Sequence, residues 1–324
     1  MMIISADEQK RLVDMNEVME YVEIALKEFS ALKTDTPIRT ALPFGESNLG
    51  LVMPSVAEDL KAMGLKYVTV VPGNAKIDKK VIQGVVLLSD IKTGEPLALL
   101  EGSYLTNIRT GALSGVATKY LAKKNATKLG IIGTGEQAHG LCRAVLAARD
   151  IETIFVFNRS EDKAKEFAKI TKETFGKEVV ICATSDEVVQ NSDILVTATT
   201  SMSPVFSAPL KPGTHINAVG SFKPTMQEIP SHALTSASKV VVESMEAALE
   251  ESGDLQIPIQ EGVFSENELH AELGKIISGE FAGRENDEEI TVFKSVGVAI
   301  VDIVIAKYFY EKALKQEVGV IVNL

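Results

Sequence analysis

The chain has 324 residues, of which 33 are basic and 44 are acidic, so its formal net charge is −11. Hydrophobic residues make up 45% of the chain, which suffices for two globular domains, and the acidic balance argues against a basic nucleic-acid-binding surface. The two cysteines, Cys142 and Cys182, cannot form a disulfide framework, and residues 1–14 lack the basic and apolar regions of a signal peptide. The most membrane-like stretch, residues 296–309, is charged and falls short of the ~20 apolar residues that a membrane span needs. We therefore expect a cytoplasmic protein that binds neither nucleic acid nor membrane.

The first part of the chain predicts helices and a sheet. Ser5 and Glu8 form a capping-box pattern ahead of apolar residues at helical spacing, from Leu12 to Phe29. Residues 37–101 consist of short apolar runs separated by Gly and Pro, which is typical of strands, with a hairpin turn at 90–94. Since no helical pattern separates these runs, we expect a largely antiparallel or mixed sheet. A helix is predicted over residues 103–123.

From residue 127 onward, apolar runs alternate with helical patterns. The apolar runs read KLGIIG, TIFVFN, EVVICA, DILVTATT, HINAVG and KVVVES. Near-continuous apolar strands separated by helices predict a doubly wound parallel sheet, so the fold class is α/β. The segment 288–315 is predicted to be a single helix, and the acidic clusters at 243–254 and 285–289 are interpreted as solvated helix faces.

A glycine-rich motif lies where a dinucleotide would bind. The residues Gly133, Thr134, Gly135, Glu136, Gln137 and Ala138 follow one predicted strand and open a predicted helix. In a Rossmann domain the first glycine permits a tight turn, the second lets a pyrophosphate approach the backbone, and the small third residue packs helix on strand. The N–H groups and the dipole of the helix then bind the phosphates. The motif therefore predicts a dinucleotide site.

The end of the second Rossmann strand bears on the choice of cofactor. An NAD site usually has Asp or Glu here, but this chain has Asn158, followed by Arg159 and Ser160. Without the carboxylate, Arg159 and Ser160 can bind a 2′-phosphate through charge-assisted hydrogen bonds. The alternative is a surface arginine beside a serine that caps a helix. We expect NADPH to be preferred and NADH to be possible.

Several segments together resemble the ornithine cyclodeaminase/mu-crystallin family in their order and spacing. They are NIRTGALSGVATKYLA, IIGTGEQA, FNRS, VTATTS, AVGS with a Pro three residues on, and TVFKSVGVAIVD. The family includes ornithine cyclodeaminases, an archaeal-type alanine dehydrogenase and reductases of ketimines such as Δ1-pyrroline-2-carboxylate. The resemblance implies a homodimer formed through a substrate-binding α+β domain of residues 1–115 with 297–324. It implies an NAD(P)-binding Rossmann domain of residues 116–296.

The resemblance also assigns roles to individual residues. Arg39, Lys66 and Arg109 match the family's substrate-binding positions, and a guanidinium can grip the carboxylate of an amino or imino acid. Lys66 interrupts an apolar strand, where a buried ammonium needs a partner and shifts its pKa readily. We expect Lys66 and Arg109 to be catalytic, with Lys66 as general acid. Taken alone, each would more simply be a surface or structural cation. Further matches are Ser295, expected to contact nicotinamide or substrate, and three cofactor positions: Thr199, Val219 and Ser221.

One departure from the family favours reduction over cyclodeamination. Ornithine cyclodeaminases carry an Asp two residues before a Pro, whereas this chain has Phe222 two residues before Pro224. Because a phenyl ring cannot accept a proton, we expect an NAD(P)H-dependent reductase of cyclic imino acids that makes L-proline from Δ1-pyrroline-2-carboxylate. The alternatives are an ornithine cyclodeaminase, an alanine dehydrogenase, or a non-catalytic crystallin-like binding protein. The four histidines lack metal-ligand spacing, so no metal is predicted.

Overall fold

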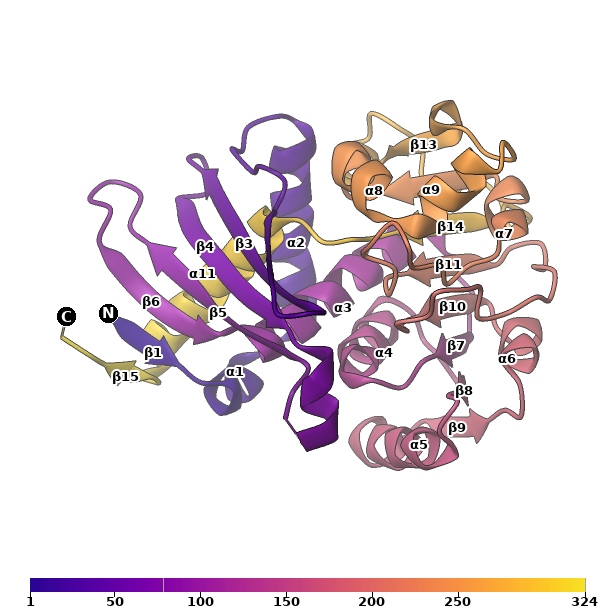
Figure 1. The fold of residues 1–324 in the computed structure, drawn as a ribbon, viewed down its shortest axis with the longest axis horizontal. Helices are drawn as coiled ribbons and strands as arrows, with labels where there is room; N and C mark the ends of the chain where they lie inside the picture. Colours follow the sequence, from indigo (N-terminus) through magenta and orange to yellow (C-terminus); the bar gives the residue numbers. More distant parts are fainter. Residues whose placement is uncertain (78, 324) are drawn as a thin grey trace. The chain divides into compact units, whose positions relative to one another are not determined.

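The computed structural model describes residues 1–77 and 79–323. The chain forms two compact units: unit 1 is Met1–Arg109 with Gly297–Leu324, and unit 2 is Thr110–Val296 (Figure 1). The first division falls inside helix α3 (Gly102–Leu121), whereas the boundary expected from the sequence lies at 115/116. Across the described residues, none of the helices is both long and apolar enough to cross a bilayer.

Unit 1 is built on a mixed sheet, which in the described residues has seven strands in the order β15-β1-β6-β5-β4-β3-β2. The strands are β1 (Met2–Ile4), β2 (Thr40–Phe44), β3 (Asn48–Ala57), β4 (Ala62–Val70), β5 (Ile82–Ser89), β6 (Pro96–Glu101) and β15 (Val320–Ile321). Strands β2 to β6 are antiparallel neighbours, and β1 pairs parallel to β6. This confirms the predicted mixed sheet, and Gly94 N donates to Asp90 O at 2.8 Å in the predicted turn.

The helices of unit 1 confirm the start predicted at Ser5 and divide the first apolar period in two. They are α1 (Ala6–Leu12), α2 (Met15–Ser30), the 3-10 helix η1 (Pro72–Ile77), the first part of α3, and α11 (Ala299–Gln316). The capping box of Ser5 and Glu8 is present at the start of α1. The apolar period then crosses two helices, because Val13 is extended and the Asp14 side chain caps α2 by accepting from Asn16 N at 2.9 Å. The helical spacing that begins at Leu12 is therefore carried mainly by α2, and α1 is a separate short helix.

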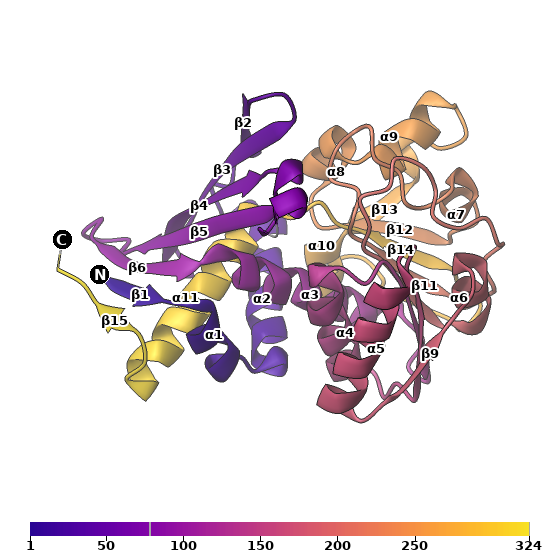
Figure 2. The ribbon, with the colours of Figure 1, turned by 60° about the horizontal axis from the view of Figure 1, so that its bottom comes forward.

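Helix α11 packs on one face of the sheet of unit 1. It contacts β3, β4, β5 and α2, and Figure 2 shows α2 and α11 on the same side of the strands. Gly64 on β4 makes this approach possible, since a Cβ there would lie 3.0 Å from Ile303 Cδ1 on α11. The apolar side chains between sheet and helix, such as Val86 and Leu88, are buried and form the core of this unit.

The predicted helix over 288–315 is wrong in its first third. Residues Thr291–Lys294 form strand β14, and α11 begins only at Ala299. Strand β14 is buried and pairs in parallel with β11 (His215–Ala218) and β12 (Lys239–Val242). A short, fully buried strand has the same continuous apolar pattern as a buried stretch of helix, so spacing alone could not separate the two.

Unit 2 confirms the predicted α/β class, with a parallel sheet covered by helices (Figure 1). Within the described part of the chain this sheet has eight strands in the order β13-β12-β14-β11-β10-β7-β8-β9. Its remaining strands are β7 (Lys128–Ile132), β8 (Thr153–Phe157), β9 (Glu178–Ile181), β10 (Ile194–Thr197) and β13 (Leu269–Glu272). Its helices are α4 (Glu136–Ala148), α5 (Glu161–Phe175), α6 (Ser185–Asn191), α7 (Ser231–Thr235), α8 (Met245–Glu251), α9 (Gly253–Gln260), the 3-10 helix η2 (Glu266–Glu268) and α10 (Leu273–Ile277).

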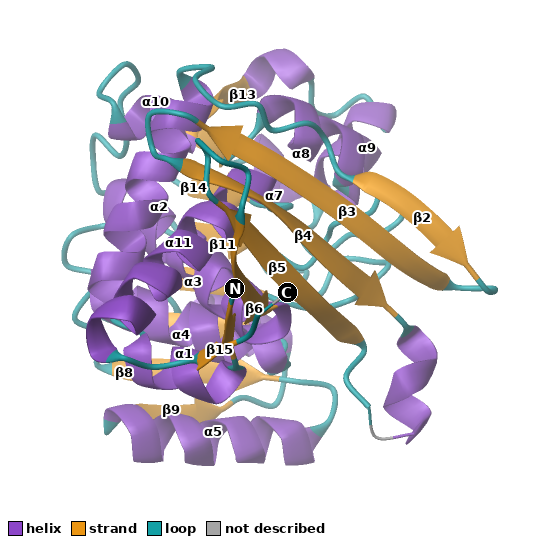
Figure 3. Cartoon of the chain, turned by 90° about the vertical axis from the view of Figure 1, so that its left-hand side faces the viewer, coloured by secondary structure: helices purple, strands orange, loops and turns teal. Residues whose placement is uncertain are grey.

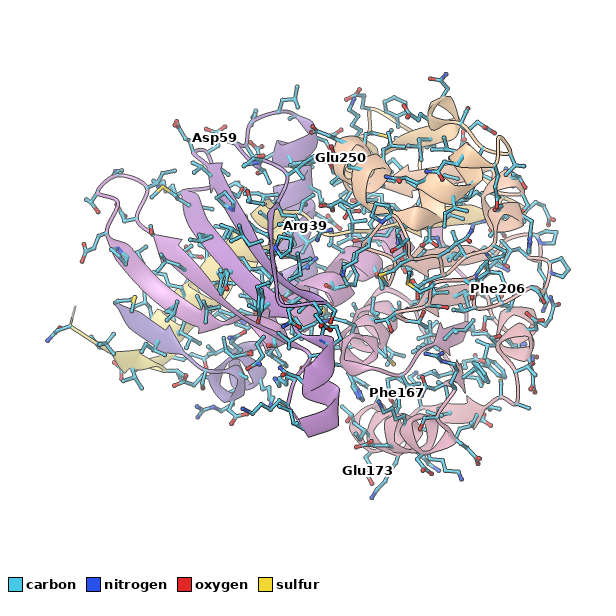
Figure 4. All side chains as sticks on the ribbon, in the orientation of Figure 1. Arg39, Asp59, Phe167, Glu173, Phe206 and Glu250 are labelled. Carbon is cyan, nitrogen blue, oxygen red and sulfur yellow. The ribbon has the colours of Figure 1, made fainter. Side chains whose placement is uncertain are left out.

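The strand order of unit 2 places its ligand site. Successive strands move outward from β7 to β8 and β9 on one side, and from β10 to β11 on the other. In doubly wound sheets ligands bind outside the carboxyl ends of the strands at this switch point, here between β7 and β10. Phe167 of α5, labelled in Figure 4, is buried in the core beside β7 and β8.

The acidic cluster at 243–254 is solvated only in part, since Glu246 and Glu250 on helix α8 are exposed whereas two other members are not. Glu243 and Asp254 are both fully buried, and Asp254 Oδ2 accepts from the buried Lys294 Nζ at 3.0 Å. Lys294, which neutralises the Asp254 carboxylate, lies 40 residues further along the chain. The charge pattern around Asp254 alone therefore could not predict this ion pair. In the other cluster, Glu285 is exposed but contacts Lys239 Nζ at 2.6 Å.

Candidate active site

Three charged side chains meet in the interior of unit 1. Lys66 Nζ donates to Asp302 Oδ1 at 2.9 Å, and Arg109 Nε donates to the same oxygen at 3.0 Å. The side chains are 3%, 8% and 0% exposed for Lys66, Arg109 and Asp302. Buried charges at this density are rare without a function, because desolvation of each ion is costly. The structure thus brings together the two residues expected to be catalytic and adds a carboxylate between them.

The fold explains why each of these residues is here. Lys66 lies in the middle of β4, in register with Met53 and Val86, and its side chain shares the face that packs on α11. Asp302 is in the first turn of α11, where the positive end of the helix dipole favours a carboxylate. Arg109 comes from α3. A strand and two helices therefore fix the three groups.

The surroundings of Lys66 change its acidity. The pKa of the Lys66 ammonium is lowered from its ordinary value to about 8: burial is the largest cause, the positive charges of Arg109 and Arg39 act in the same direction, and Asp302 opposes them. An ammonium with a pKa near neutrality holds a proton at physiological pH and can also release it, as a general acid must. A pKa of about 8 is compatible with the general-acid role predicted for Lys66.

The Arg109 guanidinium lies against a glycine backbone. Gly297 has a φ of +86°, and a Cβ there would be 2.6 Å from Arg109 Nη1 and 3.0 Å from Nη2. Any larger residue would displace the guanidinium and would also strain the backbone. Gly297 therefore belongs to the framework of this cluster.

Arg39 is close enough to act on Lys66 electrostatically. It lies in the segment that leads from α2 to β2 and is half-buried (Figure 4). All three basic residues expected to bind substrate are therefore in unit 1, with Lys66 and Arg109 joined through Asp302 and Arg39 nearby. The expected substrate contact Ser295 belongs to unit 2.

Unit 2 fits a dinucleotide at the glycine motif. Gly133 has a φ of +93°, and a Cβ there would lie 2.6 Å from Ala198 O, so the turn after β7 needs glycine. At Gly135, the N-cap of α4, an added Cβ would meet no atom within 4 Å, which leaves the space that a pyrophosphate requires. Ala138 is fully buried and packs the helix on the sheet. The three small residues have the geometry that the motif predicted.

Two polar atoms beside this turn lack a partner within the described chain. They are Thr134 Oγ1 and Gln137 Oε1, both buried. Buried polar groups are normally hydrogen-bonded, so partners supplied by a ligand would account for both. This agrees with phosphate or ribose groups at the start of α4, which also carries Glu136.

Among the residues that follow β8, Asn158 and Ser160 make local hydrogen bonds, whereas Arg159 is exposed to solvent. Asn158 Oδ1 accepts from Thr134 N at 3.5 Å, and its Nδ2 donates to Ser160 O at 3.1 Å. Ser160 is the N-cap of α5 and accepts from Lys163 N, which is the capping role weighed for it above. Arg159 is exposed. Asn158 thus ties this loop to the glycine turn, and Arg159 is accessible to an incoming phosphate.

A buried carboxylate that the sequence did not reveal organises the loops after β10 and β11. Glu228 Oε1 accepts from Thr199 N at 2.5 Å, and Oε2 accepts from Gly220 N at 2.6 Å and Thr197 Oγ1 at 3.1 Å. Burial and the nearby Asp254 raise the pKa of Glu228, and Lys294 opposes this. Glu228 therefore holds together the loops at the carboxyl ends of two neighbouring strands, β10 and β11.

The other expected positions in unit 2 lie at the same edge and are ordered by local contacts. Val219 N donates to Thr197 O at 3.1 Å, and Ser221 Oγ donates to Met226 O at 2.7 Å. Ser295 Oγ donates to Glu243 Oε1 at 3.1 Å. Within the described residues, no group of three His, Cys, Asp or Glu side chains could hold a metal ion.

Comparison with known proteins gives a consistent result. The family model of the ornithine cyclodeaminase/mu-crystallin family matches residues 1–317. A Δ1-pyrroline-2-carboxylate reductase of Bacillus cereus is 64% identical over 320 residues, covering 98% of each chain. The structure of Thermococcus litoralis Δ1-pyrroline-2-carboxylate reductase in complex with NADH and L-proline matches with a TM-score of 0.96 and 43% identity, covering 99% of this chain and 100% of that one. An archaeal alanine dehydrogenase dimer with bound NAD matches with a TM-score of 0.93 and 35% identity, covering 100% and 99%.

Full-length similarity of this degree, together with the glycine turn and the buried basic cluster, establishes the family. This chain belongs to the ornithine cyclodeaminase/mu-crystallin family.

Proposed function

We propose that this protein is an NAD(P)H-dependent reductase of cyclic imino acids, which converts Δ1-pyrroline-2-carboxylate to L-proline. The observation that carries the proposal is the buried cluster of Lys66, Arg109 and Asp302, which offers a carboxylate-binding guanidinium next to an ammonium with a pKa of about 8. The Bacillus and Thermococcus relatives that carry this name are similar to the chain over nearly its whole length.

The residues of unit 1 have separate tasks in this reaction. Arg109 and Arg39 bind the carboxylate of the imino acid, because a guanidinium matches a carboxylate with paired hydrogen bonds. Lys66 gives a proton to the ring nitrogen, which makes the C=N carbon electrophilic. When bound, the nicotinamide cofactor supplies the hydride that this carbon accepts. Protonation of nitrogen and reduction of carbon together yield the secondary amine of proline.

The residue at position 222 favours reduction. Phe222 stands where the cyclodeaminases of the family have an aspartate, and the Lys223 ammonium lies 5.8 Å from the centre of its ring. Neither group can accept a proton from the side-chain ammonium of ornithine. A preformed cyclic imine needs no such acceptor, so the residues present suffice for its reduction.

The experiment that tests this function uses the purified protein with NADPH or NADH. Addition of Δ1-pyrroline-2-carboxylate should oxidise the reduced cofactor and give L-proline, identified by chiral chromatography. Consumption of cofactor without proline formation, or no consumption at all, would contradict the proposal.

We further propose that NADPH is preferred over NADH, on the strength of the exposed Arg159 and the absence of an acid at position 158. Arg159→Ala should raise the KM for NADPH by roughly 10–150-fold through loss of a charge-assisted contact, and should leave the KM for NADH nearly unchanged. Lys165→Ala, which removes an exposed cation from the same region, is the matched control. Equal losses with both cofactors would rule out a 2′-phosphate contact.

We also propose a homodimer formed through the sheet of unit 1. The face opposite α11 carries four exposed large apolar side chains: Leu42, Phe44, Tyr67 and Val85, 40–49% exposed. Cross-strand pairing places Tyr67 beside Val85, and Leu42 beside Gly50, on this face, whose strands are visible in Figure 3. Exposed apolar area of this kind marks an interface.

The dimer is tested by light scattering at micromolar concentration. The wild type should have the mass of two chains, and Tyr67→Glu should shift it toward one, because a carboxylate would be desolvated in the interface. Ile170→Glu, at an exposed apolar residue of α5, should keep the wild-type mass. A monomeric wild type would contradict the proposal.

A further inference from the structure

Asp302 occupies an unusual position for a buried carboxylate. Its Oδ1 accepts from both Lys66 Nζ and Arg109 Nε, whereas its Oδ2 is buried without a hydrogen-bond partner among the described residues. An ion pair that served only to stabilise the fold would satisfy both oxygens, since a buried acceptor left unpaired destabilises the folded state. The Asp302 carboxylate thus holds the two cations in place at a cost to the stability of the folded state.

The backbone around Asp302 is shaped to permit this placement. Gly64 lets α11 approach β4, since a Cβ there would also lie 2.3 Å from Leu87 O, and Gly297 provides the surface for the Arg109 guanidinium. Without these glycines neither α11 nor the guanidinium could keep its place. The two glycines thus allow Asp302 Oδ1 to lie within hydrogen-bond distance of two cations, Lys66 Nζ on β4 and Arg109 Nε on α3.

We propose that Asp302 is a positioning residue, which fixes Lys66 Nζ and Arg109 Nε relative to each other and keeps the Lys66 ammonium charged until it protonates the substrate. The inference rests on the proposed function, in which Lys66 is the general acid. Asp302 acts through Lys66 and Arg109 and needs no contact with substrate. The sequence analysis did not pair Asp302 with Lys66, since the two residues lie 236 positions apart.

The charges around Lys66 determine how the loss of Asp302 should change the pKa of Lys66. Asp302 of α11 is the negative group, and Arg109 of α3 and Arg39 of the segment before β2 are the positive ones. Asparagine in place of Asp302 leaves Lys66 buried beside two cations with no counter-charge. The charged form of Lys66 is then disfavoured, so its pKa must fall below about 8.

The first test is the pH dependence of kcat for imine reduction. In the wild type kcat should fall as the pH rises through about 8, where Lys66 loses its proton. In Asp302→Asn this fall should move to lower pH by about one to three units, the usual effect of one adjacent opposite charge. Asp14→Asn makes the same chemical change at an exposed helix cap and should keep the wild-type profile. A uniformly lower kcat with an unmoved profile would make Asp302 merely structural and overturn the proposal.

The second test does not depend on the reaction. In protein labelled with carbon-13 at lysine Cε, one resonance that is missing from Lys66→Met should titrate near pH 8 in the wild type and at lower pH in Asp302→Asn. If the wild type fails to reduce the imine but this shift is seen, the proposed function is wrong and the control of Lys66 by Asp302 stands. If the resonance does not move, the control by Asp302 is wrong whatever the reaction.

A conservative variant covers the case in which Asp302→Asn does not fold. Asp302→Glu keeps the charge but moves it by one methylene, so the Lys66 resonance should titrate within about one pH unit of the wild type, while misplacement of the cations lowers kcat at every pH, by up to about 100-fold. A kcat equal to that of the wild type at all pH values would show that the position of the carboxylate is unimportant.

Discussion

Lys66→Met is expected to lower kcat for imine reduction by about 10²–10⁴-fold, the usual contribution of a general acid. Methionine fills most of the space of the lysine stem, but it has no proton to give and leaves the carboxylate of Asp302 with Arg109 as its remaining cation. The KM for the imine should change less, because the carboxylate contacts proposed for Arg109 and Arg39 are retained. Steady-state kinetics at a pH below 8 provide the measurement, since there Lys66 of the wild type is protonated.

Two controls accompany this variant. Lys10→Met removes a lysine that is 57% exposed and pairs with Asp7 on the surface of the same unit, and it should leave kcat unchanged. Thermal melting shows whether the variant is folded at the assay temperature. If folded Lys66→Met keeps a kcat near that of the wild type, the proton comes from another source, such as water.

Arg109→Ala should harm both binding and turnover. Loss of the charge-assisted contact to the substrate carboxylate raises the KM by about 10–150-fold. Loss of orientation at the reacting carbon lowers kcat by a further factor of about 100, the effect of a misplacement of about 1 Å. The change also removes a cation next to Lys66, so the pKa of Lys66 should rise and the fall of kcat should move to higher pH.

This combination distinguishes Arg109 from a residue that only stabilises the fold. Arg11→Ala, at an exposed arginine of α1, is the matched control and should behave as the wild type. A raised KM with unchanged kcat would restrict Arg109 to affinity and would contradict its role in orientation.

Much of the fold could be predicted from the sequence because its signals are local. The capping box at Ser5, the turn at Gly94 and the glycine motif at Gly133 and Gly135 each depend on residues a few positions apart. Strands β7 to β12 of unit 2 were recognisable as separate apolar runs. Strand β14 was not, because a buried strand and a buried stretch of helix look alike over four residues.

The candidate site was predictable only in part, for a different reason. Lys66 can be recognised in the sequence as a cation within an apolar strand. Its partner Asp302 lies 236 residues away, in a helix that the spacing of its apolar residues predicts without any use of Asp302. A buried lysine requires a counter-charge, so the lone acid within VGVAIVDIVIA was a usable signal. Glu228 gave no such signal, since its partners are mainly backbone N–H groups.

Reduction of a cyclic imine should prevail over deamination of an amino acid in this protein. The measurement compares kcat/KM on one enzyme preparation for three substrates: Δ1-pyrroline-2-carboxylate with NADPH, L-ornithine with detection of released ammonia, and pyruvate with ammonia and NADPH. We expect kcat/KM for the imine to exceed that for either of the other two substrates by at least about 100-fold, because position 222 holds Phe in place of the aspartate of the family's cyclodeaminases. Ammonia release from ornithine at a rate comparable to that of imine reduction would contradict it.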